Sequence, residues 1–215
     1  MKRLIITGLA ALLPLEVYAQ SQEGWFLRAY GGYSQLSDID ADTTGVATAA
    51  TPADISVDGG FTAGAGAGYR YGDNWAVELA WEYRSNDADT DLEGGAQYPD
   101  GNLAASLFYL NGYYQLAGSG KWDPYIGAGL AWLQEVDIDL EGDGPERSYS
   151  GDGDSGFQLF AGANYALTDR LALQGEIRYT YFDDLDLEGE SGAAGEFSAV
   201  DYDPLTLQLG ILYRF

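Results

Sequence analysis

Eight segments of this chain alternate apolar and polar residues with a period of two, and this alternation limits the chain to a β fold. In the segment that begins at Trp75, Leu79 shares a face with Trp75, whereas Glu78 lies on the opposite face. Successive side chains of a strand point to opposite faces, and about ten residues of tilted strand cross a membrane. The eight segments span residues 24–34, 60–71, 75–85, 102–116, 122–136, 155–167, 171–182 and 204–215.

The connections between these segments alternate strictly between short and long. The short ones cover residues 72–74, 117–121 and 168–170, and the long ones cover residues 35–59, 86–101, 137–154 and 183–203. An up-and-down barrel in a membrane has short turns on one side and long loops on the other. We therefore predict an all-β fold: an eight-stranded antiparallel up-and-down transmembrane β-barrel, closed between its first and last strands, with short periplasmic turns and long acidic extracellular loops.

The two ends of the chain carry an export signal and a strand signal. Residues 1–19 have a basic start, an apolar stretch and small residues before the expected cleavage site, as a signal peptide has. At the other end, the last strand alternates apolar and polar residues as far as Tyr213 and Phe215. We expect the signal peptide to be removed and residues 20–215 to form one outer-membrane β-barrel domain.

Several strand motifs resemble those of small outer-membrane β-barrels. They are Gly-Ala-Gly-Ala-Gly-Tyr at residues 64–69, Trp-Asp-Pro-Tyr-Ile-Gly-Ala-Gly at residues 122–129 and Phe-Ala-Gly-Ala-Asn-Tyr at residues 160–165. The chain resembles the family that includes the OmpA barrel domain, OmpX, OmpW and opacity-type surface proteins. The resemblance implies the outer membrane of a Gram-negative cell, contact with its lipid and lipopolysaccharide, and a terminal signal at Tyr213 and Phe215 that the barrel-assembly machinery reads.

The charge balance and the missing residue types exclude several functions. The chain has 34 acidic and 10 basic residues, no histidine and no cysteine. A net charge of −24 argues against a nucleic-acid partner, and the lack of cysteine rules out disulfides and thiol chemistry. The enzymes among outer-membrane barrels that the resemblance implies, namely lipases, palmitoyl transferases, lipid A deacylases and omptin-type proteases, rely on histidine, which this chain lacks. Glu78 and Glu82 are four residues apart, roughly 13 Å along a strand, which is too far for a paired-carboxylate mechanism, so we expect no catalysis.

Charged residues also fall on faces that point into the barrel. An eight-stranded barrel has room for little more than its own side chains, so interior charges have to be paired. One interpretation is a structural network of ion pairs, and the other is a narrow or gated ion path lined by the same side chains. The predicted interior charge network comprises Arg28, Arg70, Glu78, Glu82, Arg84, Glu176, Arg178 and Arg214.

The long connections hold most of the acidic residues, often at every second position. Two of these runs partly match the start of a calcium-binding loop, although neither has an acid at its twelfth position. They are either a solvated, mutually repelling surface or weak sites for Ca²⁺ or Mg²⁺, and no other cofactor is expected. The candidate metal ligands are Asp137, Asp139 and Glu141 in one run, and Asp184, Asp186 and Glu188 in the other.

Two functions fit these observations. The first is a surface protein with a structural or interaction role, such as envelope integrity, adhesion or cation-mediated surface contact. The alternative is a narrow channel or an OmpW-like transporter of small molecules across the outer membrane. The acidic connections favour the first function, and the charged interior weighs against a path for apolar molecules.

The terminal aromatic residue gives a prediction about assembly. Changing Phe215 to Asp should lower the amount of heat-modifiable, folded protein in the membrane several-fold, because it removes both an interfacial anchor and part of the assembly signal. Changing a serine of a long connection, Ser56, to Asp serves as the control and should leave the folded band nearly unchanged. Equal amounts of folded protein in the two variants would contradict the prediction.

Overall fold

The computed structural model describes residues 23–46, 51–92, 97–142 and 146–215, which form twelve antiparallel β-strands in one sheet. The predicted signal peptide, residues 1–19, lies outside the described residues. Within the described ranges, no helix is long and apolar enough to cross a membrane.

Eight of the strands close into a ring, which we call the basal barrel. Strands that follow one another around this ring pair side by side, and β12 closes it by pairing with β1, with Ile211 opposite Ala29. The predicted eight-stranded antiparallel barrel is therefore confirmed. Its strands are β1 (Gly24–Gln35), β4 (Gly60–Tyr71), β5 (Trp75–Leu92), β6 (Gln97–Gln115), β7 (Trp122–Leu140), β9 (Ser155–Ala166), β10 (Leu171–Gly189) and β12 (Leu205–Arg214).

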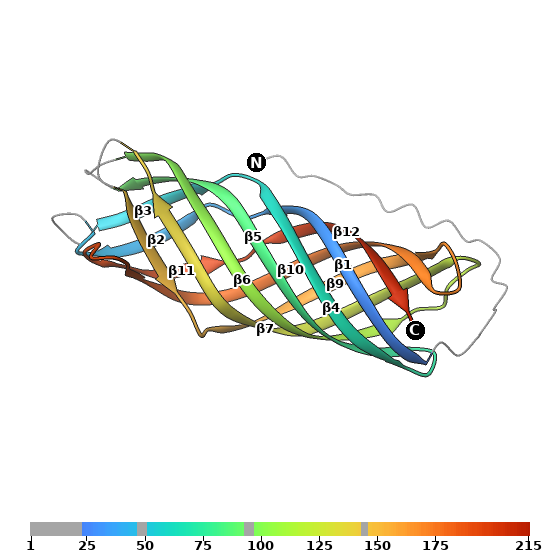
Figure 1. Cartoon of the computed structure of the whole chain (residues 1–215). Coiled ribbons are helices and arrows are strands. Elements are labelled where there is room, and N and C mark those ends of the chain that lie inside the picture. The colour runs from blue at the N-terminus through green and yellow to red at the C-terminus, as the bar shows by residue number, and fades with distance from the viewer. Residues whose placement is uncertain (1–22, 47–50, 93–96, 143–145) are drawn as a thin grey trace, which may run out of the picture.

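Four of these strands continue past the basal barrel into a second ring, which we call the distal barrel. The long strands β5, β6, β7 and β10 are joined there by β2 (Ile39–Thr44), β3 (Thr51–Val57), β8 (Arg147–Gly151) and β11 (Glu196–Tyr202). Their pairings run β11–β2–β3–β5–β6–β7–β8–β10 and return to β11. Figure 1 shows the two rings as one elongated cylinder, with β2, β3 and β11 at the end far from the C-terminus.

The distal barrel corrects one part of the sequence prediction. The four long connections were expected to be solvated loops, but most of their described length is strand. The acids at every second position looked like a hydrated surface, yet the residues between them are apolar. In β10, for example, Asp186 is exposed while Leu185 and Leu187 are buried. The alternation of acid and apolar residue was a strand signal with its apolar side turned inward.

Polarity therefore inverts along each long strand. On β5, the outward face carries Leu79 in the basal barrel and Asp89 in the distal barrel, and both side chains are exposed. The inward face of the same strand carries Glu82 in the basal barrel and Leu92 in the distal barrel, and both are buried. An apolar outside with a charged inside suits hydrocarbon, whereas an acidic outside with an apolar inside suits water.

Aliphatic and aromatic side chains from the strands of the distal barrel fill its interior. Ile55, Leu107 and Ile138 are nearly or completely buried there, and Tyr149 meets Phe197 edge to face at 4.9 Å between ring centroids. Burial of this kind stabilises by about 1.5–3 kcal/mol for each large side chain. The distal barrel thus has the core of a water-soluble β protein.

The apolar exterior of the basal barrel ends in two aromatic bands. Near the short turns, Trp122 packs against Tyr165 at 5.0 Å. Near the distal barrel, Phe157 packs against Tyr181 at 5.5 Å. Aromatic side chains with one apolar and one polar edge settle at the two water interfaces of a membrane. The bands therefore mark where the exterior of the barrel passes from hydrocarbon to water.

The inverted polarity predicts different costs for the same substitution on the two barrels. Leu187 is 0% exposed in the distal core, whereas Leu209 is 74% exposed on the basal exterior. Changing Leu187 to Ala should destabilise the distal barrel by about 2–5 kcal/mol, because it leaves a cavity. Changing Leu209 to Ala should cost clearly less. Amide hydrogen exchange of β10 and β11 measures the difference, and equal exchange in the two variants would refute the assignment of the core.

Candidate functional site

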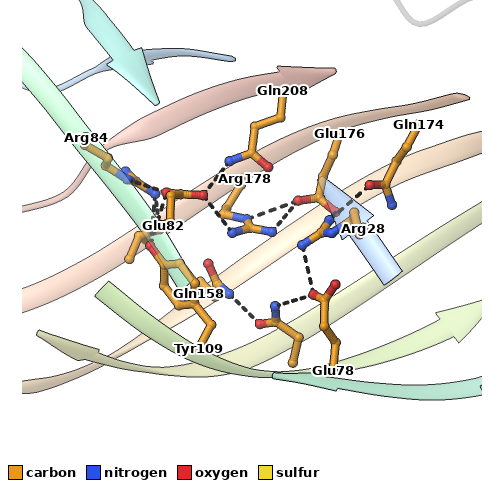
Figure 2. Close-up of polar contacts among 12 residues, drawn as sticks. Arg28, Glu78, Glu82, Arg84, Tyr109, Gln158, Gln174, Glu176, Arg178 and Gln208 are labelled. Atoms are coloured by element: carbon orange, nitrogen blue, oxygen red, sulfur yellow. Dashed lines mark hydrogen bonds and ion pairs between the residues drawn. The ribbon is translucent and has the colours of Figure 1, made fainter. Parts of the chain in front are cut away.

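Six interior residues form one continuous chain of alternating charges, which we call the ion chain (Figure 2). The ion pairs follow one another along the lumen from Arg84, next to the distal barrel, to Glu78, nearer the short turns. Each of the four residues between these two contacts two residues of opposite charge. The links are Arg84 Nε to Glu82 Oε1 at 2.6 Å, Glu82 Oε2 to Arg178 Nη1 at 3.3 Å, Arg178 Nη2 to Glu176 Oε1 at 2.6 Å, Glu176 Oε2 to Arg28 Nη1 at 3.2 Å, and Arg28 Nη2 to Glu78 Oε2 at 2.8 Å.

The strand period explains how these groups meet. Glu82 and Arg84 are two residues apart on β5, so both point into the lumen, and Glu176 and Arg178 have the same relation on β10. Three strands separate β5 from β10 in either direction around the ring, so the pair between Glu82 and Arg178 crosses the lumen. The ion chain therefore ties opposite walls of the basal barrel together.

Neutral donors add hydrogen bonds to the three carboxylates, while Oε1 of Glu78 has no partner among the described residues. Glu82 accepts from Gln208 Nε2 at 2.7 Å, and Glu176 accepts from the hydroxyl of Tyr125 at 2.8 Å. Glu78 accepts from the hydroxyl of Tyr113 at 2.6 Å and from Asn111 at 3.0 Å. A buried charge is tolerated when it is both paired and hydrogen-bonded, and three arginines against three glutamates leave the ion chain neutral.

Inward glycines give these large side chains their space. A Cβ added to Gly66 would lie 2.5 Å from Oε1 of Glu78, and one added to Gly64 would lie 2.6 Å from the hydroxyl of Tyr30. Either contact is too close, so a side chain at these positions would displace the group opposite. The glycine-rich motif on β4 thus makes room for neighbouring side chains.

The ion chain is closed to solvent. Each of its members is at most 3% exposed, and Glu82, Arg84 and Arg178 are completely buried. Beyond Arg84, the lumen is filled by the core of the distal barrel, in which Leu107 and Tyr202 are almost completely buried. Among the described residues, the ion chain therefore closes the lumen of the basal barrel, and the apolar core occupies the distal barrel.

Two predicted members of the network lie elsewhere. Arg70 and Arg214 point inward at the end with the short turns, and both reach Asp123 rather than the ion chain. Arg70 Nη1 is 3.0 Å from Asp123 Oδ2, and Arg214 Nη2 is 3.8 Å from the same oxygen. The prediction of a single network of eight residues was thus too broad, because Asp123, near the start of β7, was not counted as an interior acid.

The acidic exterior of the distal barrel brings carboxylates together in two groups. Oxygens of Glu135, Asp137 and Glu190 lie within 4.8 Å of one another, and so do those of Asp183, Asp184 and Asp201. Of the predicted metal ligands, Asp137 and Asp184 belong to these groups, and Asp139 instead accepts a hydrogen bond from Ser148 at 2.5 Å. Glu141, Asp186 and Glu188 belong to neither group.

The groups join residues far apart in the sequence because neighbouring strands hold them at one level. Asp137 on β7 and Glu188 on β10 both pair with Ser150 of β8, which also donates a hydrogen bond to Glu190 at 2.6 Å. No linear spacing could show this register. Partial burial, together with the charges of Glu135, Asp139 and Glu190, raises the pKa of Asp137 from 3.8 to about 6.

Comparison with known proteins agrees with this architecture. A family model described as "Outer membrane protein beta-barrel domain" matches residues 5–215. Uncharacterized proteins of Brucella abortus and Brucella melitensis are 28% identical to this chain, and the match covers 73% of this chain and 67% of theirs.

Solved structures show the same fold at low sequence identity. The outer membrane protein OprG from Pseudomonas aeruginosa has a TM-score of 0.63 at 18% identity, over 91% of this chain and 98% of its own. The outer membrane protein AlkL has a TM-score of 0.52 at 18% identity, over 96% and 97% of the two chains. Neisserial surface protein A has a TM-score of 0.51 at 16% identity, over 89% and 97%.

The ion chain predicts a non-additive effect of substitutions. Changing Arg28 to Met should lower the free energy of unfolding by about 3–5 kcal/mol, because Glu78 and Glu176 lose a buried partner. Changing Arg28 to Met together with Glu78 to Gln should cost less than the single change. Arg170, an exposed residue of a short turn, provides the control as Arg170→Met. Denaturant unfolding in lipid measures the three variants, and a double variant at least as unstable as Arg28→Met would contradict the prediction.

The raised pKa of Asp137 predicts a dependence on pH. A carboxyl whose pKa is higher in the folded state binds its proton more tightly there, so its contribution to stability is full below pH 3.8 and is lost as the pH rises through about 6. The side-chain NMR signal of Asp137 should titrate near pH 6, and Glu190→Gln should lower that midpoint. A midpoint near 3.8 would show that neither partial burial nor the neighbouring carboxylates raise the pKa of Asp137.

Proposed function

The chain belongs to the outer membrane protein β-barrel domain family, and from that membership we propose that it is a non-enzymatic surface protein of the Gram-negative outer membrane. In this proposal the basal barrel anchors the protein in the lipid, and the distal barrel extends from the cell surface as a rigid β-barrel with an acidic exterior. The protein has a structural role or a role in surface interactions: the acidic exterior of the distal barrel contacts the phosphate-rich cell surface through divalent cations.

The closed lumen is the observation that carries this proposal. A transport protein needs a continuous path, whereas here the ion chain closes the basal barrel and an apolar core occupies the distal barrel. What the protein offers to its surroundings is therefore its outer surface. On the distal barrel, the described part of that surface is rich in carboxylates and has one basic residue, Arg147, which donates a hydrogen bond to the backbone oxygen of Val46.

The acidic surface begins at the level expected for lipid headgroups. Tyr181 of the outer aromatic band donates a hydrogen bond to Asp183 at 3.1 Å, and Asp183 belongs to the group with Asp184 and Asp201. Carboxylates at this level repel the phosphates of lipopolysaccharide unless a cation lies between them. Exposed oxygen ligands of this kind bind Ca²⁺ with a Kd on the order of 10⁻⁴–10⁻³ M.

A narrow channel is the second candidate, and one observation favours it. The inner members of the ion chain each contact two opposite charges, so an exchange of partners would change the shape of the lumen without leaving a charge unpaired. A conducting path would also require the apolar core of the distal barrel to move. The two candidates are distinguished by conductance.

The proposal predicts cation-dependent binding without conductance. Protein refolded into vesicles should retain purified lipopolysaccharide in millimolar Ca²⁺ and release it on chelation, and single barrels in a planar bilayer should pass no current. Neutralising outward acids as Asp183→Asn, Asp184→Asn and Asp201→Asn should reduce the retention several-fold. Neutralising Asp73 and Asp169 on the short turns should not.

Two results would overturn the proposal. Retention of lipopolysaccharide that responds to Ca²⁺ no more than to an equal ionic strength of NaCl would show that the acids are only a hydrated surface. Steady current through the unmodified protein that is lost in Glu82→Gln would establish the channel instead.

A further inference from the structure

An open groove crosses the hydrocarbon-facing exterior of the basal barrel. Its volume of about 950 Å³ lies within the range of about 300–1,000 Å³ that is typical of ligand pockets. The floor is made of small, exposed residues on two neighbouring strands, with Ala29 of β1 directly opposite Ala65 of β4. Larger side chains on the flanking strands form the walls, among them Leu79 and Trp81 on β5 and Ile211 on β12. The exterior is therefore hollowed where β1 and β4 carry alanine.

The groove runs across the strands of the basal barrel. One row of cross-strand partners follows it through six strands, and its members are Trp132, Phe108, Trp81, Ala65, Ala29 and Ile211. At about 4.8 Å between neighbouring strands, the five steps of this row cover about 24 Å. Because strands in such a barrel tilt by about 35–45°, this path descends through roughly 15 Å, which is the depth of one membrane leaflet.

The end of the groove at β7 is its outer end and carries polar groups. Trp132 is opposite Ser155, where β9 begins next to the distal barrel. At this level the indole Nε1 of Trp81 donates a hydrogen bond to the hydroxyl of Ser106 at 2.9 Å, and that hydroxyl donates to Oε1 of Gln134 at 3.3 Å. The NH₂ group of Gln134 can then donate to an acceptor at the head of the groove, such as the carbonyl that begins an acyl chain.

The shape of the groove selects a flexible apolar occupant. Six of the eight strands of the basal barrel share the groove, so it bends around more than half of the circumference. A second barrel is convex and would touch only a few neighbouring strands, so it cannot follow this path. A hydrocarbon chain bends with the surface, needs no hydrogen-bonding partner along its length, and is the solvent of the exterior between the two aromatic bands.

We propose that this groove seats one acyl chain of lipopolysaccharide, with the carbonyl of the chain at Gln134 and its methyl end over Ala29. The outer end of the groove opens toward the leaflet that carries lipopolysaccharide in a Gram-negative outer membrane. Alanines in the floor let the chain lie close to the backbone and make many van der Waals contacts. The inference rests on the proposed function for the orientation of the barrel, and it adds an apolar contact to the cation-mediated contact at the headgroups.

Photo-cross-linking tests the groove. The protein is refolded into phospholipid vesicles with a trace of lipid A, the membrane anchor of lipopolysaccharide, that carries a diazirine in one acyl chain. Saturable cross-links should form on β1 and β4, and Ala65→Trp, which fills the floor, should reduce them several-fold. Ala161→Trp makes the same substitution on the exposed face of β9, outside the groove, and should leave them unchanged. Heat-modifiability verifies that each variant is folded.

Three results would overturn the proposal. Cross-links spread evenly over the exterior, β9 included, would show that the groove holds a chain no better than the rest of the lipid-facing surface. Equal labelling of β1 and β4 by a phospholipid with the same diazirine chain would show that the groove does not select lipopolysaccharide. Disulfide-linked dimers of Ala65→Cys in high yield, in a chain with no cysteine of its own, would show that a second copy covers the groove.

Chelation separates a failure of this inference from a failure of the cation-mediated contact. The labelled lipid stays in the vesicle membrane when divalent cations are removed, so the cross-links on β1 and β4 should persist in chelator. They should also persist when Asp183, Asp184 and Asp201 are changed to Asn, because contacts with hydrocarbon need no cation. Loss of the cross-links under either condition would show that the headgroup contact alone holds the lipid, and would refute the seating of the chain.

Discussion

Hydrocarbon offers no partner for a backbone N–H or C=O group, and this constraint shapes the whole basal barrel. Every strand must be paired on both sides, so the first strand has to meet the last, as β1 meets β12. Closing eight strands leaves a lumen wide enough only for side chains. Charges placed there must neutralise one another, and the ion chain is the arrangement in which three arginines and three glutamates do so.

The same strands continue from hydrocarbon into water, and the polarity of their inward and outward side chains is reversed accordingly. Above the outer aromatic band, the pairing continues around β2, β3, β8 and β11, but apolar residues now occupy the inside and acids the outside. The distal barrel is held together by burial and the basal barrel by closure and charge pairing. The two parts share four strands, so each fixes the register of the other.

The period of two was enough to predict the eight basal strands, their faces and the inward position of each charged residue in the ion chain. It was not enough to predict the distal barrel, because an acid at every second position fits both a hydrated loop and a strand with an apolar inner face. Contacts between residues on different strands were also not predictable from the sequence. Glu135 meets Glu190, and Arg214 meets Asp123, through strand register that no local pattern records.

The uninterrupted course of β5, β6, β7 and β10 through both barrels has a mechanical consequence. A pull on the distal end acts along these strands, while their hydrogen bonds lie across them. Force is therefore carried as shear by many bonds at once, instead of opening them one after another from an end. The distal barrel is thus not tethered by flexible segments alone, and tension on it passes directly to the strands of the basal barrel.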